Sequence, residues 1–70
     1  MTHNQKRERI ETRLQEKLNH EINNISFNRM VVYFDSYEFS IHENFTYLYL
    51  YHKGVLTALI DLDDVIDLNI

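Results

Sequence analysis

Apolar residues recur with the period of an α-helix in the first third of the chain. They are Ile10, Leu14, Leu18, Ile22 and Ile25. At about 100° per residue, all five lie within about 120° of one another, which is one face of an amphipathic helix. The residues between them are mainly Gln, Lys, Arg and Glu, which favour helix. The pattern predicts a single helix over residues 3–25.

After Ser26 the period changes from that of a helix to the alternation of β-strands. Strands are predicted over residues 29–34, 37–42, 45–51 and 55–62, with turns at 35–36, 43–44 and 53–54. The last of these turns contains Gly54, which can adopt a positive φ in a tight hairpin. The predicted fold is α+β, in a single domain. It has one N-terminal helix packed on an antiparallel meander of about four strands, which spans residues 27–62. Residues 63–70 fit either a short helix, which we slightly favour, or a fifth strand.

A two-residue loop at Lys53 and Gly54 also predicts which side chains share a face of the last hairpin. One face would hold the pairs Tyr51–Leu56, Tyr49–Ala58, Tyr47–Ile60 and Phe45–Leu62. The other would hold His52–Val55, Leu50–Thr57, Leu48–Leu59 and Thr46–Asp61. The first face is apolar throughout, so we expect its row of aromatic residues to pack on the helix.

The second face of that hairpin would leave four aliphatic side chains without cover: Leu48, Leu50, Val55 and Leu59. One helix cannot cover both faces of a sheet, and leaving these side chains in water forgoes about 1.5–3 kcal/mol each. We therefore expect a homodimer or larger oligomer that buries this face. The alternative is that the C-terminal segment folds back over it.

Composition limits the classes of protein to consider. The chain has 70 residues, a net charge of −4 and no Cys, so a disulfide scaffold and a thiolate zinc site are excluded. Its first residues are polar, and no apolar run approaches the roughly 18 residues of a membrane span. We expect neither a signal peptide nor a membrane anchor, and a cytoplasmic location.

Motifs that would carry catalysis, a metal or a cofactor are incomplete. His20-Glu21 opens a zinc-binding string, but Asn24 stands where the second His is needed. The acidic residues near the C-terminus fail the calcium-loop pattern at Val65 and Ile66. One glycine is too few for a phosphate-binding loop, and no Ser has the setting of a nucleophile. We expect no catalytic residue, metal or cofactor, and a protein that is not an enzyme.

The charge is unevenly distributed along the chain. Residues 26–70 contain seven carboxylates against two cations. The leading candidate for a partner-binding patch is Asp61, Asp63, Asp64 and Asp67, with Glu38 and Glu43 as secondary candidates. A solvated acidic turn is the simpler interpretation of these residues. As a binding patch they would face a basic surface and could imitate the phosphate backbone of DNA.

A short stretch of this half is similar to a known class of inhibitors. Residues 49–54, with the sequence YLYHKG, resemble a tyrosine-rich strand of small phage-encoded inhibitors of uracil-DNA glycosylase. In those inhibitors a helix follows the strand, whereas residues 55–62 here predict another strand. The leading hypothesis is a small acidic protein-binding module, of the inhibitor or accessory type found in phages and mobile elements, that occludes an unidentified protein.

The alternative is a regulator associated with nucleic acid. Four cations on the predicted helix lie within about 80° of one another, which is enough for a salt-sensitive phosphate contact. They are Lys6, Arg9, Arg13 and Lys17. Glutamates interleave with them, which favours an ion-paired helix surface instead. The aromatic row from Phe45 to Tyr51 could stack bases, but the residues flanking it are acidic rather than basic.

Overall fold

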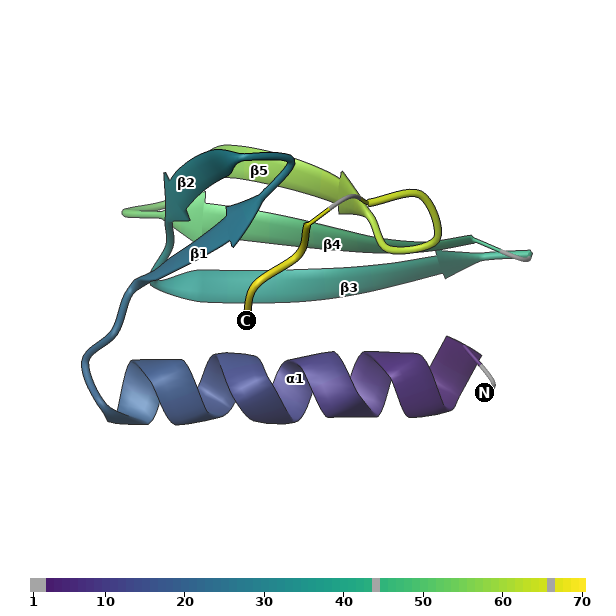
Figure 1. Cartoon of the computed structure of the whole chain (residues 1–70), viewed down its shortest axis with the longest axis horizontal. Helices are drawn as coiled ribbons and strands as arrows, with labels where there is room; N and C mark the ends of the chain where they lie inside the picture. The colour runs from purple at the N-terminus through teal and green to yellow at the C-terminus, as the bar shows by residue number, and fades with distance from the viewer. Residues whose placement is uncertain (1–2, 44, 66) are drawn as a thin grey trace.

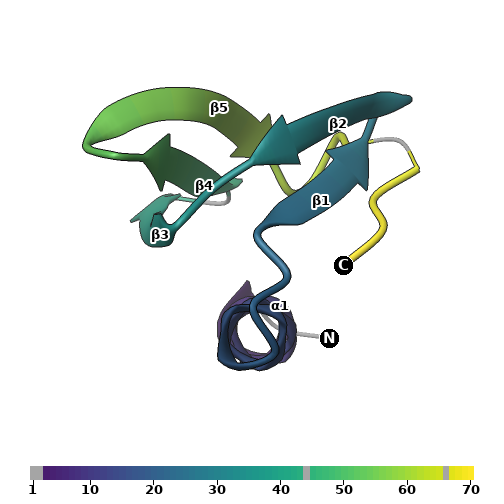
Figure 2. The same ribbon diagram turned by 90° about the vertical axis from the view of Figure 1, so that its left-hand side faces the viewer.

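The computed structural model describes residues 3–43, 45–65 and 67–70, and it confirms the α+β class. One helix, α1, precedes five strands: α1 (His3–Asn19), β1 (Asn24–Phe27), β2 (Met30–Tyr33), β3 (Ser36–His42), β4 (Phe45–His52) and β5 (Val55–Asp61). β1 and β2 form a hairpin, and the other strands form an antiparallel sheet in the order β3-β4-β5. The two sheets arch over α1, which runs along their concave side (Figures 1 and 2).

The helix ends at Asn19, six residues earlier than the apolar period predicts. Glu21 takes a positive φ of 59°. The amide of Ile22 donates to the carbonyl of Lys17 at 2.7 Å, and that of Glu21 donates to the carbonyl of Leu18 at 3.1 Å. These two bonds and the left-handed residue are the features of a Schellman cap, which satisfies the last carbonyls and turns the chain away. The helical period of Ile22 and Ile25 is therefore coincidental, because Ile25 belongs to the following strand.

That following strand, β1, is absent from the sequence-based prediction. β1 and β2 are joined by Asn28 and Arg29, whose φ values of 48° and 64° suit a two-residue hairpin loop. The sequence predicts Arg29 inside a strand, because Asn-Arg lacks the glycine of the usual Asn-Gly turn signal. The hairpin buries Ile25 and Phe27 in the core, with 1% and 6% of their surfaces exposed.

A β-bulge in β5 determines which side chains share a face of the three-stranded sheet. Tyr51 pairs with Leu56 as predicted, but Leu50 pairs with Ala58, so Thr57 is an extra residue without a partner in the ladder. A shift of one residue moves all the side chains beyond it to the opposite face of the sheet. The Lys53-Gly54 loop is confirmed, with positive φ at both residues. The cross-strand pairs predicted beyond Tyr51–Leu56 are wrong.

The core lies between α1 and the concave side of the strands. Its buried side chains are Leu14, Ile25, Phe27, Phe34, Leu48, Leu50, Ile60 and Leu62. In the described part of residues 63–70 there is no helix. The segment instead runs beside β1, where Asn69 and Ser26 exchange two backbone hydrogen bonds of 2.8 and 3.3 Å. Asn44 and Ile66, which belong to the predicted turn and C-terminal element, lie outside the described residues.

Candidate functional site

The convex side of the three-stranded sheet presents a regular array of large side chains that are exposed or half-buried. We call the following residues the outer tyrosine face: Glu38, Tyr47, Tyr49, Tyr51, Leu56, Leu59 and Asp61. The ladders place Glu38 and Leu59 on either side of Tyr49, and Asp61 beside Tyr47. Leu56 and Leu59 are 51% and 55% exposed, and the three tyrosines are half-buried. The aromatic row expected to pack on the helix therefore faces away from it.

The polar groups of the outer tyrosine face are carboxylates and phenol hydroxyls. The hydroxyl of Tyr51 donates to Glu38 Oε2 at 3.4 Å. Desolvation raises the pKa of Tyr51, and the negative charge of Glu38 raises it further, so this hydroxyl stays protonated and able to donate. At the far end of the row, the Tyr47 ring contacts His42 and Phe45, with ring centroids 6.2 and 6.4 Å apart. The face therefore combines flat apolar area with hydrogen-bond donors and two negative charges.

The oligomer interface predicted from the sequence does not exist as one surface. Leu48 and Leu50 are fully buried, with 0% exposed, in the core against α1, so they cannot contact a second molecule. Val55 is 65% exposed, and Leu59 belongs to the outer tyrosine face. The error follows from the bulge at Thr57, because a regular pairing would place Leu48 and Leu59 side by side.

The predicted acidic residues are dispersed, and several have structural contacts. The Asp61 carboxylate accepts a hydrogen bond from the Asp63 amide at 3.0 Å. Asp63 accepts one from the Thr46 amide at 3.0 Å and forms an ion pair with Lys6 at 3.4 Å. Together these contacts hold the turn that follows β5. Asp64 is exposed in the same turn, and Glu43 is exposed directly after β3.

Two of the acidic candidates lie apart from that turn. Asp67 is 3.9 Å from Arg29, the residue at the tip of the β1–β2 hairpin. Glu38 lies in the middle of the convex side, as its pairing with Tyr49 shows. Only Asp61 and Glu38 belong to the outer tyrosine face, so the acidic residues do not form a single patch.

The cations of the predicted stripe contact other parts of the chain. The Lys6 ammonium contacts Asp63, that of Lys17 donates to the Asn24 carbonyl at 3.2 Å, and Arg13 donates to the Ile70 carbonyl at 3.1 Å. Lys6, Arg13 and Arg9 line an open groove of about 410 Å³ whose other wall includes Leu68 and Ile70. The helix cations therefore help to hold the C-terminal segment and the chain after the helix.

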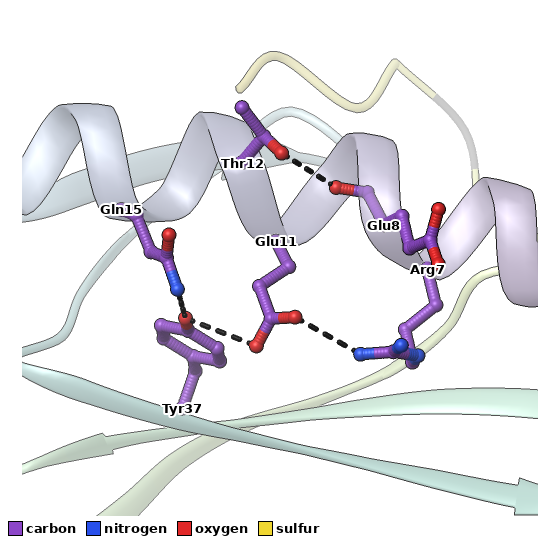
Figure 3. Close-up of polar contacts among 6 residues, drawn as sticks. All are labelled: Arg7, Glu8, Glu11, Thr12, Gln15 and Tyr37. Atoms are coloured by element: carbon purple, nitrogen blue, oxygen red, sulfur yellow. Dashed lines mark hydrogen bonds and ion pairs between the residues drawn. The ribbon is translucent and has the colours of Figure 1, made fainter.

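A polar cluster that sequence analysis missed joins α1 to β3 (Figure 3). The Tyr37 hydroxyl donates to Glu11 Oε2 at 3.2 Å and accepts from the Gln15 amide at 3.0 Å, while Arg7 pairs with Glu11 at 2.9 Å. Burial raises the pKa of Tyr37; the Gln15 hydrogen bond opposes this and the charge of Glu11 adds to it. The cluster fixes the helix against the edge strand. Glu11 and Gln15 are one turn apart on α1, which is the signal that could have indicated a shared contact.

Other kinds of site are not found in the part of the chain that the structure describes. Within residues 3–43, 45–65 and 67–70, no three His, Asp or Glu side chains gather in a group able to hold a metal ion. The helix found in these ranges lacks the length and apolar character needed to cross a membrane. No protein-family model, curated protein or solved structure matches this chain.

Proposed function

We propose that this protein is a non-enzymatic binding module that covers, and thereby occludes, a basic surface of another protein through its outer tyrosine face. The observation that carries the proposal is the exposure of Leu56 and Leu59 beside a row of tyrosines on a regular sheet surface. Tyrosine is enriched in the centres of protein interfaces, where it combines apolar area with a hydrogen-bonding hydroxyl. Contiguous exposed apolar area on a small protein is typical of a binding surface.

The charge of this face determines the kind of partner that fits. Glu38 and Asp61 flank the tyrosine row, and its seven defining residues include no cation. A matching surface would place Lys or Arg opposite these carboxylates and an aliphatic or aromatic side chain against Tyr49 and Leu59. The same carboxylates would repel nucleic acid from the tyrosines, so base stacking is the less favourable use of the row. The sequence also predicts an acidic module that binds another protein. We propose a different surface for that binding.

Selection from a random peptide library displayed on phage tests the proposal while the partner is still unidentified. The immobilised chain should enrich peptides that combine Lys or Arg with aromatic or aliphatic residues. Their binding should weaken with salt, because a Debye length of about 8 Å at physiological ionic strength screens charge pairs. Leu59→Ser should weaken the selected peptides by about tenfold.

The matched control is Ile22→Ser, which removes an aliphatic side chain that is 45% exposed but lies just after α1, away from the convex face. It should leave peptide binding unchanged. Peptide binding that survives Leu59→Ser would contradict the proposal. Binding of a single-stranded oligonucleotide that is lost in Arg9→Ala/Arg13→Ala would do so as well, and would favour the regulator associated with nucleic acid.

A further inference from the structure

The free edge of β3 differs from the other strand edges of this protein. The outer edge of β1 is occupied by the C-terminal segment through the two hydrogen bonds between Ser26 and Asn69. β5 is bulged at Thr57, whose hydroxyl lies 3.0 Å from the Tyr33 carbonyl at the end of β2. β2 itself is only four residues long. Each of these edges is short, distorted or covered, which are the ways in which proteins prevent edge-to-edge pairing.

β3 has none of these protections. It is seven residues long and pairs with β4 in an unbroken register from Ser36 to His42. Its sequence, SYEFSIH, contains neither Lys nor Pro. Apart from its ladder with β4, the backbone of these residues forms no hydrogen bond with any other described residue. Side chains of α1 contact the concave side of β3 at Tyr37 and Phe39, where the Arg7 guanidinium lies 5.9 Å from the centroid of the Phe39 ring.

We infer that the β3 edge is a self-association surface, on which a second copy of the chain pairs its own β3 in antiparallel orientation, centred on Phe39. A twofold axis perpendicular to the sheet keeps the faces of both copies aligned, as a symmetric dimer requires. All seven residues of β3 then lie in the shared ladder. Phe39 faces its counterpart, Tyr37 faces Ile41, and Glu38 faces Ser40.

Charge and exposure select this register over its neighbours. Centring the pair on Glu38 would place two carboxylates directly opposite each other, which is destabilising. Centring it on Ser40 would leave Ser36 and Tyr37 outside the ladder. The chosen register also covers Ile41, an aliphatic side chain on the concave side of the sheet that is 43% exposed in the single chain. The dimer would join the two outer tyrosine faces into one continuous surface.

Sedimentation velocity of the full chain across a concentration series tests this inference, which does not depend on the proposed function. The wild type should approach twice 8.5 kDa as concentration rises. Ile41→Lys introduces the kind of charge that blocks edge pairing and should raise the dimer dissociation constant on the order of 100-fold. Val31→Lys is the control, because Val31 is 62% exposed on the short strand β2 and takes no part in the shared ladder. It should leave the dimer intact.

The folded state of each variant is checked by urea unfolding, since both replaced side chains are exposed in the single chain. In the wild type, hydrogen exchange of the β3 amides should slow as concentration rises. A wild type that stays at 8.5 kDa up to about 1 mM would overturn the inference. A dimer that persists in Ile41→Lys would overturn it equally, because the contact would then lie elsewhere.

Discussion

The two sides of β4 have similar apolar content but opposite environments. On the concave side, Thr46, Leu48 and Leu50 are each 0% exposed, whereas the alternating residues Tyr47 and Tyr49 are half-buried on the convex side. The pattern of β4 alone fits either orientation. The bulge in β5 decides between them, because it aligns Ala58 and Ile60 with Leu50 and Leu48. One irregular residue in a neighbouring strand can therefore determine which face of a strand joins the core and which faces solvent.

Two leucines that a regular hairpin would place side by side test this difference most strongly. Leu48→Ala removes a fully buried side chain and should lower the free energy of unfolding by about 3 kcal/mol. Leu59→Ala acts on a side chain that is 55% exposed and should cost less than about 1 kcal/mol. Urea denaturation of both variants measures the two losses. Equal losses of unfolding free energy in the two variants would contradict the assignment of Leu48 to the core face and Leu59 to the solvent-exposed face.

The bulge itself depends on Thr57. Its hydroxyl lies 3.1 Å from the Leu50 carbonyl and 3.0 Å from the Tyr33 carbonyl, so it connects β5 with β4 and β2. Thr57→Val keeps the shape of the side chain and removes these contacts, and should lower the free energy of unfolding by about 1–2 kcal/mol. Thr12→Val is the control, since the one bond of the Thr12 hydroxyl among the described residues is to the Glu8 carbonyl, on the exposed side of α1. If both variants unfold at the same urea concentration, the Thr57 hydroxyl does not stabilise the bulge.

The smallest expected effect compares a tyrosine on each side of the sheet. Tyr37→Phe removes the hydroxyl that bonds both Glu11 and Gln15, and should cost about 0.5–1 kcal/mol, because the cluster is only partly buried. Tyr51→Phe removes a longer, exposed bond to Glu38 and should leave stability unchanged. Thermal unfolding of the two variants side by side checks the difference. A larger loss in Tyr51→Phe would show that the convex side contributes to folding.

The fold class could be predicted because it depends on periodicity, which each segment carries within itself. The apolar stripe from Ile10 to Leu18 and the glycine turn at Gly54 specify a helix and a hairpin without reference to the rest of the chain. β1 was missed because Arg29 stands in its tight turn where the usual Asn-Gly signal has a glycine, and because Ile25 happens to continue the helical period.

The candidate site could not be located in the same way, because the faces of β4 depend on long-range register. One signal was nevertheless available. A two-residue turn after His42 aligns the polar residues Glu38 and Ser40 of β3 with Tyr49 and Tyr47. That alignment places the tyrosine row on the same face of the sheet as the polar side chains of β3, which is the face exposed to solvent. The bulge at Thr57 had no comparable signal, since threonine is common in regular strands.

Interstrand nuclear Overhauser effects between β4 and β5, measured on the isotopically labelled chain, test the assignment of the two faces most directly. The bulged register predicts cross-strand backbone contacts between Tyr49 and Leu59 and between Tyr51 and Leu56, with Thr57 lacking a partner. Contacts between Tyr49 and Ala58 and between Leu50 and Thr57 would contradict it. The hairpin would then be regular, and the tyrosine row would share its face with Ala58 and Ile60 instead of Leu59 and Asp61.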